Sequence, residues 1–186
     1  MRLLLVTITL LTALGARAQS SMRSVLTNMP DTIIPYLTAN SRLDFIDFID
    51  SGMKAEATNE LNGKSRLLRL TDRFASLSLN ESSAVDLCLL DLSSPIDSVT
   101  QVVCAVWTFG DDIRESDIRF YTPAWLPLRT NDFIQQLSYP MYTATLSDEA
   151  LLVVQPSSAL EAPANEEQTT TEKEAIALKW DGKTFN

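Results

Sequence analysis

The sequence of 186 residues contains no histidine, only five glycines and only two cysteines. The lack of histidine excludes Ser-His-Asp and Cys-His nucleophilic mechanisms, and every metal site built on imidazole ligands. Five glycines are too few for the glycine-rich loops that cradle phosphate groups. The composition is 45% hydrophobic and 21% charged, which is typical of a folded globular protein. We therefore expect a folded protein that carries no cofactor.

No apolar run is long enough to span a bilayer. The run Leu3–Leu14 has about a dozen residues, whereas a transmembrane helix needs about 20. It follows a basic start and precedes Ala16-Arg17-Ala18, a small-x-small cleavage site, so residues 1–18 are predicted to be a secretory signal peptide. The alternative is an N-terminal anchor. We expect an exported chain, periplasmic or secreted, that begins at Gln19 and has no transmembrane segment after cleavage.

Basic residues are in the minority. The 24 acidic residues outnumber the 15 lysines and arginines, which gives a formal net charge of −9. Cleavage after Ala18 also removes Arg2 and Arg17, so the mature chain is more acidic still. A chain of this charge repels phosphate backbones, which argues against a nucleic-acid partner.

Two helices are predicted near the N-terminus. Asn28 is placed to cap a helix over Pro30–Thr38, with a proline in the first turn as helix N-termini prefer. Ser41 with Asp44 resembles a capping box, and it begins a second helix with a broad apolar stripe. Gly52 is expected to end that helix.

The signals become β from Met53 onward. The dipeptide Asn62-Gly63 predicts a type I′ hairpin turn with both residues at positive φ. No helical crossover separates the apolar runs, so we expect an antiparallel meander. The predicted strands are Lys54–Leu61, Lys64–Leu70, Phe74–Leu79, Val85–Leu92, Val99–Phe109 and Ile118–Tyr121.

The last third of the sequence is mixed. Asn131 is placed to cap a short helix through Leu137. The polar segment 156–174 is predicted to be a flexible loop. Further strands are expected at Tyr142–Leu146, Ala150–Gln155 and Ala175–Trp180. Together these elements predict one α+β domain over residues 19–186: an antiparallel β-meander sheet with the N-terminal helices packed on one face, and the C-terminal strand closing an edge.

The two cysteines, Cys88 and Cys104, fall in consecutive predicted strands. A register that sets them opposite each other also sets Leu90 against Val102, so apolar residues meet on both faces. Residues directly opposite share a face and are within reach of a disulfide if the pair is not hydrogen-bonded. Export would permit oxidation. The alternative is two buried thiols that pack as small hydrophobes, and both readings stay open.

The aromatic residues are candidates for partner binding. Tyr121 and Trp125 cluster at a predicted strand end, and Trp180 flanks the last turn, whereas Trp107 lies within an apolar strand and is expected in the core. Exposed aromatic clusters bind sugars or proteins. Packing of strand ends against the N-terminal helices is more common, and we favour it.

Two groups of acidic residues are candidate cation sites. Asp44, Asp47 and Asp50 recur every three residues on one helix face, and the turn 111–117 is rich in carboxylates. The turn lacks the alternating spacing and central glycine of a calcium loop. A solvated helix face and a polar hairpin tip are the favoured interpretations, so we expect no metal site.

Several segments resemble a known family. They are Met29–Leu37, Arg42–Phe48 and Leu70–Asp72, then Phe120, Tyr121 and Trp125, and the closing Leu178–Lys183. In these segments the sequence resembles a family of exported Bacteroidales proteins named only as domain-of-unknown-function family 3256. The resemblance implies a secreted or envelope-located protein and carries over no catalytic residue.

The leading functional hypothesis is a non-enzymatic exported module of the cell envelope, which binds a protein or glycan partner or has a structural role as an accessory subunit. The alternative is a carboxylate-dependent hydrolase of envelope glycans, since only a lysine or a carboxylate could act as a base here. An exposed apolar patch on the sheet would favour the module. A cleft with two facing acids and perturbed pKa values would favour the hydrolase.

Overall fold

The computed structural model describes residues 19–135, 137, 139–157 and 174–186. The predicted signal peptide and most of the predicted loop 156–174 lie outside these residues. Two α-helices open the described chain, α1 (Met22–Thr27) and α2 (Ala39–Asp50). The strands are β1 (Glu56–Thr58), β2 (Lys64–Leu70), β3 (Phe74–Asn80), β4 (Ser83–Ile96), β5 (Val99–Phe109), β6 (Glu115–Tyr121), β7 (Pro127–Leu128), β8 (Tyr142–Leu146), β9 (Leu151–Pro156) and β10 (Ile176–Lys179).

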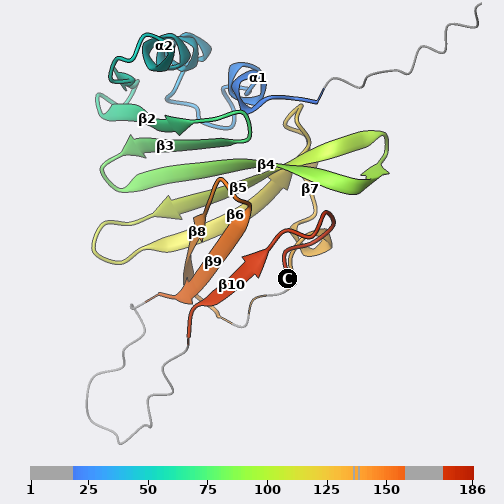
Figure 1. The fold of residues 1–186 in the computed structure, drawn as a ribbon. Helices are drawn as coiled ribbons and strands as arrows, with labels where there is room; N and C mark the ends of the chain where they lie inside the picture. The colour runs from blue at the N-terminus through green and yellow to red at the C-terminus, as the bar shows by residue number, and fades with distance from the viewer. Residues whose placement is uncertain (1–18, 136, 138, 158–173) are drawn as a thin grey trace, which may run out of the picture.

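The strands form two antiparallel sheets (Figure 1). Seven strands make a meander in the order β1-β2-β3-β4-β5-β6-β7, in which each strand pairs with its neighbour in the chain. The other three form a smaller sheet in the order β10-β9-β8. The predicted α+β meander is therefore confirmed. One detail of it is wrong: the C-terminal strand β10 closes an edge of the smaller sheet, because it pairs with β9, and not an edge of the meander.

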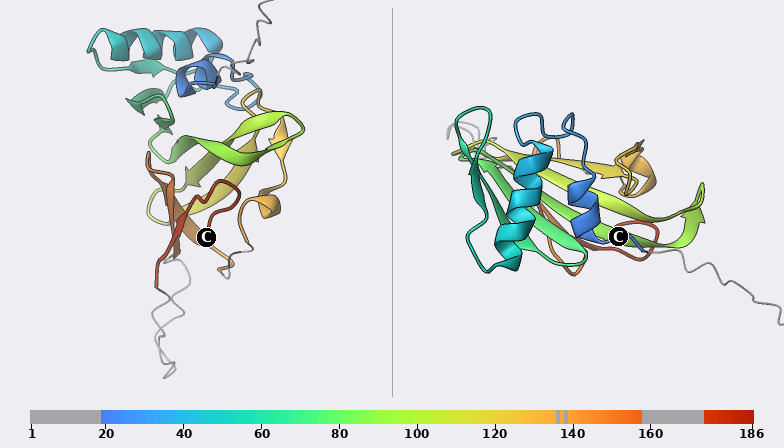
Figure 2. Two further views of the ribbon diagram at one scale, coloured as in Figure 1. Left: turned by 45° about the vertical axis from the view of Figure 1, so that its right-hand side comes forward. Right: turned by 90° about the horizontal axis from the view of Figure 1, so that it is seen from above.

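The meander is the middle of three layers (Figure 2). The helices cover one of its faces, as predicted, and the three-stranded sheet covers part of the other. Alternation along the central strands separates the two cores. Leu87 and Leu89 of β4 face the helices, whereas Cys88 and Leu90 face the smaller sheet. Both faces of β4 and β5 are buried, which explains their nearly continuous apolar sequences.

The predicted register of β4 and β5 is confirmed, with Cys88 opposite Cys104 and Leu90 opposite Val102. The hairpin is longer than expected, because Ile96 still pairs with Val99. Its two turn residues, Asp97 and Ser98, have φ of 46° and 72°, as a type I′ turn requires.

The predicted type I′ turn at Asn62-Gly63 is wrong. Only Asn62 has a positive φ there, at 61°. The backbone N–H of Asn59 donates to the carbonyl oxygen of Gly63, and the Asn59 side chain accepts from the N–H groups of Leu61 and Gly63. The Asn59 side chain thus organises a longer loop between β1 and β2.

The first helix is not where the sequence predicts it. α1 precedes Asn28, which is its C-cap and not an N-cap, while residues 31–37 form turns. α2 is confirmed, although Thr38 and not Ser41 caps it, by accepting from the N–H of Ser41. Gly52 follows the end of α2 with φ of 67°, as expected.

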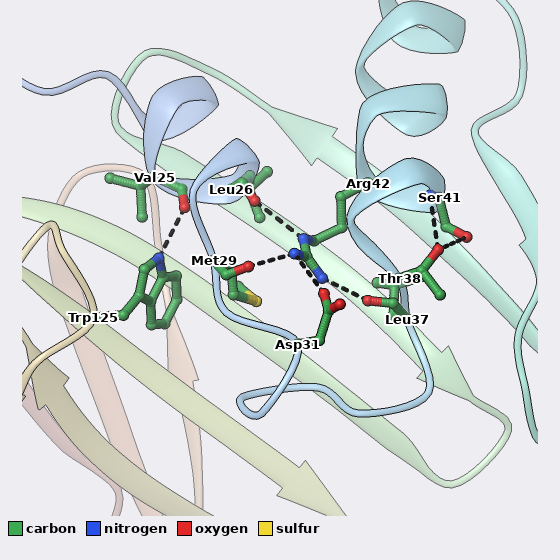
Figure 3. A network of polar contacts seen from close by, with 9 residues as sticks. All are labelled: Val25, Leu26, Met29, Asp31, Leu37, Thr38, Ser41, Arg42 and Trp125. Atoms are coloured by element: carbon green, nitrogen blue, oxygen red, sulfur yellow. Dashed lines mark hydrogen bonds and ion pairs between the residues drawn. The ribbon is translucent and has the colours of Figure 1, made fainter.

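A buried arginine accounts for the turns at residues 31–37. Arg42 of α2 is 2% exposed, and it donates to the carbonyl oxygens of Leu26 at 3.2 Å, Leu37 at 2.5 Å and Met29, and to the carboxylate of Asp31 at 3.0 Å (Figure 3). These carbonyl groups lie at both ends of the loop. They bind the guanidinium, and the carbonyl group of Leu26 also accepts from the N–H of Met29, so Arg42 holds the loop to α2.

The predicted helix after Asn131 is also wrong. A single 3-10 turn, Thr130–Asp132, takes its place, with Arg129 at its N-cap. Ile134 then forms a β-bridge with Phe185 in the core beside the smaller sheet. A residue in such a pairing has extended backbone, so the predicted helix does not continue there. In the described part of the chain, no helix combines the length and apolar character needed to cross a membrane.

Candidate functional site

A pocket of about 200 Å³ opens on the helix-covered face of the meander, beside the loop 31–37. We call it the aromatic pocket. Its lining residues are Ile33, Ile34, Tyr36, Trp107, Phe109 and Arg119.

Alternation along two neighbouring strands brings the sheet residues of the pocket together. Trp107 and Phe109 of β5 are two residues apart and so point to the same face. Arg119 lies on β6, beside Asp117, which is the direct cross-strand partner of Trp107. Trp107 is 8% exposed and Phe109 is 46% exposed. The pocket therefore runs from the edge of the core out to the surface.

The indole nitrogen of Trp107 has no hydrogen-bond partner, and it is the only such buried side-chain nitrogen or oxygen found among the described residues. The two other tryptophans are satisfied: Nε1 of Trp125 donates to the carbonyl oxygen of Val25 at 2.9 Å, and Nε1 of Trp180 to that of Asp91 at 2.8 Å. A buried donor without an acceptor costs about 1–3 kcal/mol. Trp107, one of the residues that line the aromatic pocket, thus carries a buried donor without an acceptor.

The polar groups at the rim are held in defined states. Nε of Arg119 lies 2.6 Å from a carboxylate oxygen of Asp117, and this hydrogen bond raises the pKa of the guanidinium. Burial raises the pKa of the Tyr36 phenol. At neutral pH the rim therefore presents a neutral hydroxyl and a guanidinium whose charge is balanced by Asp117.

A second, polar groove of about 590 Å³ lies between the β1–β2 loop and the β3–β4 turn. It is lined by Leu61, Asn62, Gly63, Lys64, Arg66, Ser78, Asn80, Glu81 and Ser82. Lys64 and Arg66 both contact Glu56, at 2.9 and 2.7 Å. Hydrogen bonds from Lys54, Lys64 and Arg66 lower the pKa of Glu56 to about 2.

The lining of this groove contains a single carboxylate. Glu81 is the one carboxylate among the lining residues. Asp86 has a pKa raised by burial, and it accepts a hydrogen bond from Ser76 at 2.6 Å, but it does not line the groove. Glycoside hydrolysis by two carboxylates needs a facing pair about 5–9 Å apart. The groove offers hydrogen-bonding groups without that arrangement.

The aromatic residues singled out from the sequence lie in two separate clusters. Tyr121 and Trp125 are buried under the helices with ring centroids 5.3 Å apart. Trp180 is half-buried against the smaller sheet, where it contacts Phe133 and Phe185. The burial of these rings favours the packing alternative, and partner binding by them stays a prediction.

Cys88 and Cys104 are buried free thiols that face the smaller sheet. Burial raises the pKa of Cys88 to about 12 and that of Cys104 well above its ordinary range. Their oxidation stays a prediction.

Of the acidic residues that are candidate cation ligands, Asp50 is paired with Arg23 at 2.8 Å. Within the described ranges, no group of three or more potential ligands is arranged to hold a metal ion.

The aromatic pocket contains residues that the sequence did not mark as functional. Phe109 and Arg119 look like ordinary strand residues, and Ile33 and Tyr36 fall in a segment predicted to be a helix. The alternation Trp107-x-Phe109 is the available signal, because two large rings on one face of a strand end require a neighbouring segment to cover them. The sequence does not reveal that the loop 31–37 covers only part of it.

Comparison with known proteins gives a family and a fold. The structure is similar to a solved domain of an uncharacterized protein from Porphyromonas gingivalis W83, with a TM-score of 0.70, 22% identity, and coverage of 89% of this chain and 96% of that one. At this identity the likeness concerns the fold alone. No curated protein matches the sequence. Residues 13–184 match the family described as protein of unknown function DUF3256, and the chain belongs to that family.

Proposed function

We propose that this protein is a non-enzymatic module, exported to the cell envelope, that binds a partner protein through the aromatic pocket. The composition of the pocket supports this proposal. Tryptophan, tyrosine and arginine are the residues most enriched at binding hot spots, and Trp107, Tyr36 and Arg119 line one small concavity. An apolar side chain of a partner would be buried there against Phe109, which is 46% exposed.

The alternatives are less well supported by the same surfaces. A glycan would suit the polar groove, but no aromatic ring lines that groove to stack on a sugar. A hydrolase would need a second carboxylate facing Glu81, and no other acid lines the groove. Export is supported by the predicted signal peptide, whose cleavage would leave Gln19 as the first residue.

Site-specific photocrosslinking in the native cells tests the proposal. A benzophenone amino acid is placed at Phe109, on the rim of the aromatic pocket, or at Ile96, which is 43% exposed on a distant hairpin end and is the matched control. We expect a discrete protein adduct from position 109 and none from position 96. Arg119→Glu should remove the adduct, because the new carboxylate would lie beside Asp117. The rim would then carry an unbalanced negative charge where an apolar side chain must enter.

Other outcomes would overturn the proposal or support one of the alternatives. Equal adducts from both positions, or none from position 109 in cells that contain the protein, would overturn the proposal. Co-sedimentation with purified cell-wall glycan that is lost in Arg66→Glu would instead support a glycan module, and release of sugar that is lost in Glu81→Gln would support the hydrolase. For export, mass spectrometry of the mature protein should find Gln19 at the N-terminus.

A further inference from the structure

We propose that the aromatic pocket receives one large apolar side chain from an extended peptide segment, and that Nε1 of Trp107 donates to a backbone carbonyl oxygen of that segment. This inference rests on the proposed function and adds the chemistry of recognition. It joins three observations: the volume of the pocket, the unmet donor on one of its lining residues, and the balanced charge at its rim.

The volume favours a single side chain. At about 200 Å³ the aromatic pocket is smaller than the roughly 300–1,000 Å³ of typical small-molecule sites. Its walls are two isoleucines and three aromatic rings, with Arg119 as the one charged residue. One aromatic or branched aliphatic side chain is the ligand that such a space and lining accommodate.

The unmet donor specifies an acceptor beside that side chain. An indole N–H can only donate, and the N–H of Trp107 has no partner in a residue that is 92% buried. Asp117 already balances the charge of Arg119 at 2.6 Å, so the rim does not call for an anionic ligand. A neutral carbonyl satisfies both conditions, and every residue of a peptide carries one next to its side chain.

The loop 31–37 supplies three of the residues that line the aromatic pocket. Nε1 of Trp107 is closed off in this structure, so an acceptor reaches it only when a wall residue shifts. Arg42 holds Asp31 and Leu37 at the two ends of the loop, whereas Ile33 and Tyr36 between them are only half-buried. These two side chains are therefore the ones whose shift the proposal invokes.

The test uses the indole signals in the proton–nitrogen NMR spectrum of the full mature chain. The three tryptophans give three signals, and Trp107→Phe assigns one of them. Acetophenone, a ring with a carbonyl, and ethylbenzene, a ring of similar size without one, are the paired probes. We expect acetophenone to shift the Trp107 signal downfield in a saturable manner and ethylbenzene to bind at least fivefold more weakly. The signals of Trp125 and Trp180, which are bonded to backbone carbonyls, serve as internal references.

A peptide arm tests the source of the carbonyl. N-acetyl-phenylalanine methylamide should shift the Trp107 signal, whereas N-acetyl-alanine methylamide should not, since it lacks the large side chain. In Trp107→Phe, acetophenone should bind no better than ethylbenzene, with unchanged Trp125 and Trp180 signals as proof of folding. No shift of the Trp107 signal with acetophenone and the phenylalanine probe, or equal shifts of all three indoles, would overturn the inference. Adducts that persist at position 109 would then leave the proposed function standing.

Discussion

The indole nitrogen of Trp125 lies 2.9 Å from the carbonyl oxygen of Val25 and donates a hydrogen bond to it (Figure 3). This contact ties the segment after β6 to α1, which is a hundred residues earlier in the chain. Trp125 therefore helps to hold the helical layer on the sheet.

A comparison of two tryptophans measures this bond. Trp125→Phe loses a buried hydrogen bond and leaves the Val25 carbonyl without that partner, so the free energy of unfolding should fall by about 1–3 kcal/mol more than the ring truncation alone would cost. Trp107→Phe is the comparison, because it truncates the same ring without breaking a hydrogen bond and also removes a buried donor that has no acceptor, so it should cost less than Trp125→Phe. Denaturant unfolding measures both, and equal losses would contradict the assignment.

The second prediction concerns the buried arginine. Arg42→Met leaves the carbonyl groups of Leu26, Met29 and Leu37 without their donor, and it should lower the free energy of unfolding by about 3–5 kcal/mol, as removal of one partner from a buried polar network does. Asp31→Asn is the control. The Asp31 side chain is 60% exposed, so its loss of charge should cost less than about 1 kcal/mol. The reverse order would show that the ion pair, and not the carbonyl contacts, holds the loop.

The third prediction concerns two glycines with positive φ. A Cβ atom at Gly182 would lie 2.1 Å from Oγ of Ser93, whereas one at Gly52 would meet nothing within 4 Å. Alanine at either position is strained by the left-handed backbone, by about 1–2 kcal/mol. Gly182→Ala should therefore lower the thermal midpoint more than Gly52→Ala, because the neighbouring hairpin must also move. Identical shifts would mean that Ser93 rotates away without cost.

The fourth prediction concerns acid stability. The pKa of Glu56 in the folded protein is lowered to about 2 by its lysine and arginine partners. A lowered pKa stabilises the folded state above the ordinary glutamate pKa, and this contribution is lost as the pH falls through the folded value. Glu56→Gln should thus reduce stability at neutral pH and flatten its decline between about pH 4.5 and pH 2. Glu60→Gln, which makes the same charge change on the same hairpin, is the matched control.

The fifth prediction concerns the thiols. Burial and raised pKa values keep Cys88 and Cys104 protonated at neutral pH, and the thiolate is the reactive form. A thiol reagent should therefore label the native protein slowly at pH 8 and label both residues at once in denaturant without reductant. A linked Cys88–Cys104 peptide after digestion would show instead that the pair is oxidised in the exported protein.

The sequence was most informative where pairing is local. The register of β4 and β5 followed from matching apolar residues on both faces around Cys88 and Cys104, because neighbouring strands in a meander leave few other solutions. The first strand of that hairpin is predicted to end at Leu92 but continues to Ile96, since Asp97 and Ser98 lack the glycine that usually marks a type I′ turn.

The sequence was least informative where distant side chains decide the local backbone. The segment after Asn28 has a proline and apolar spacing typical of a helix, yet Arg42 donates hydrogen bonds to carbonyl groups at both of its ends. The aromatic pocket depends on the same loop, because three of its lining residues lie on the loop and the others on β5 and β6. Neither the loop nor the pocket can be read from Trp107 and Phe109 alone.

The arrangement of the strands also bears on the order in which the protein folds. Every strand of the meander pairs with its neighbour in the chain, so each pairing closes only a short loop and costs little entropy. The contacts that complete the opposite face span longer distances: β10 pairs with β9 across residues 157–175, and Ile134 bridges to Phe185. The meander is thus expected to form early, and the smaller sheet to seal the Cys88 side late. Backbone amides of β10 should accordingly exchange with solvent faster than those of β4 and β5.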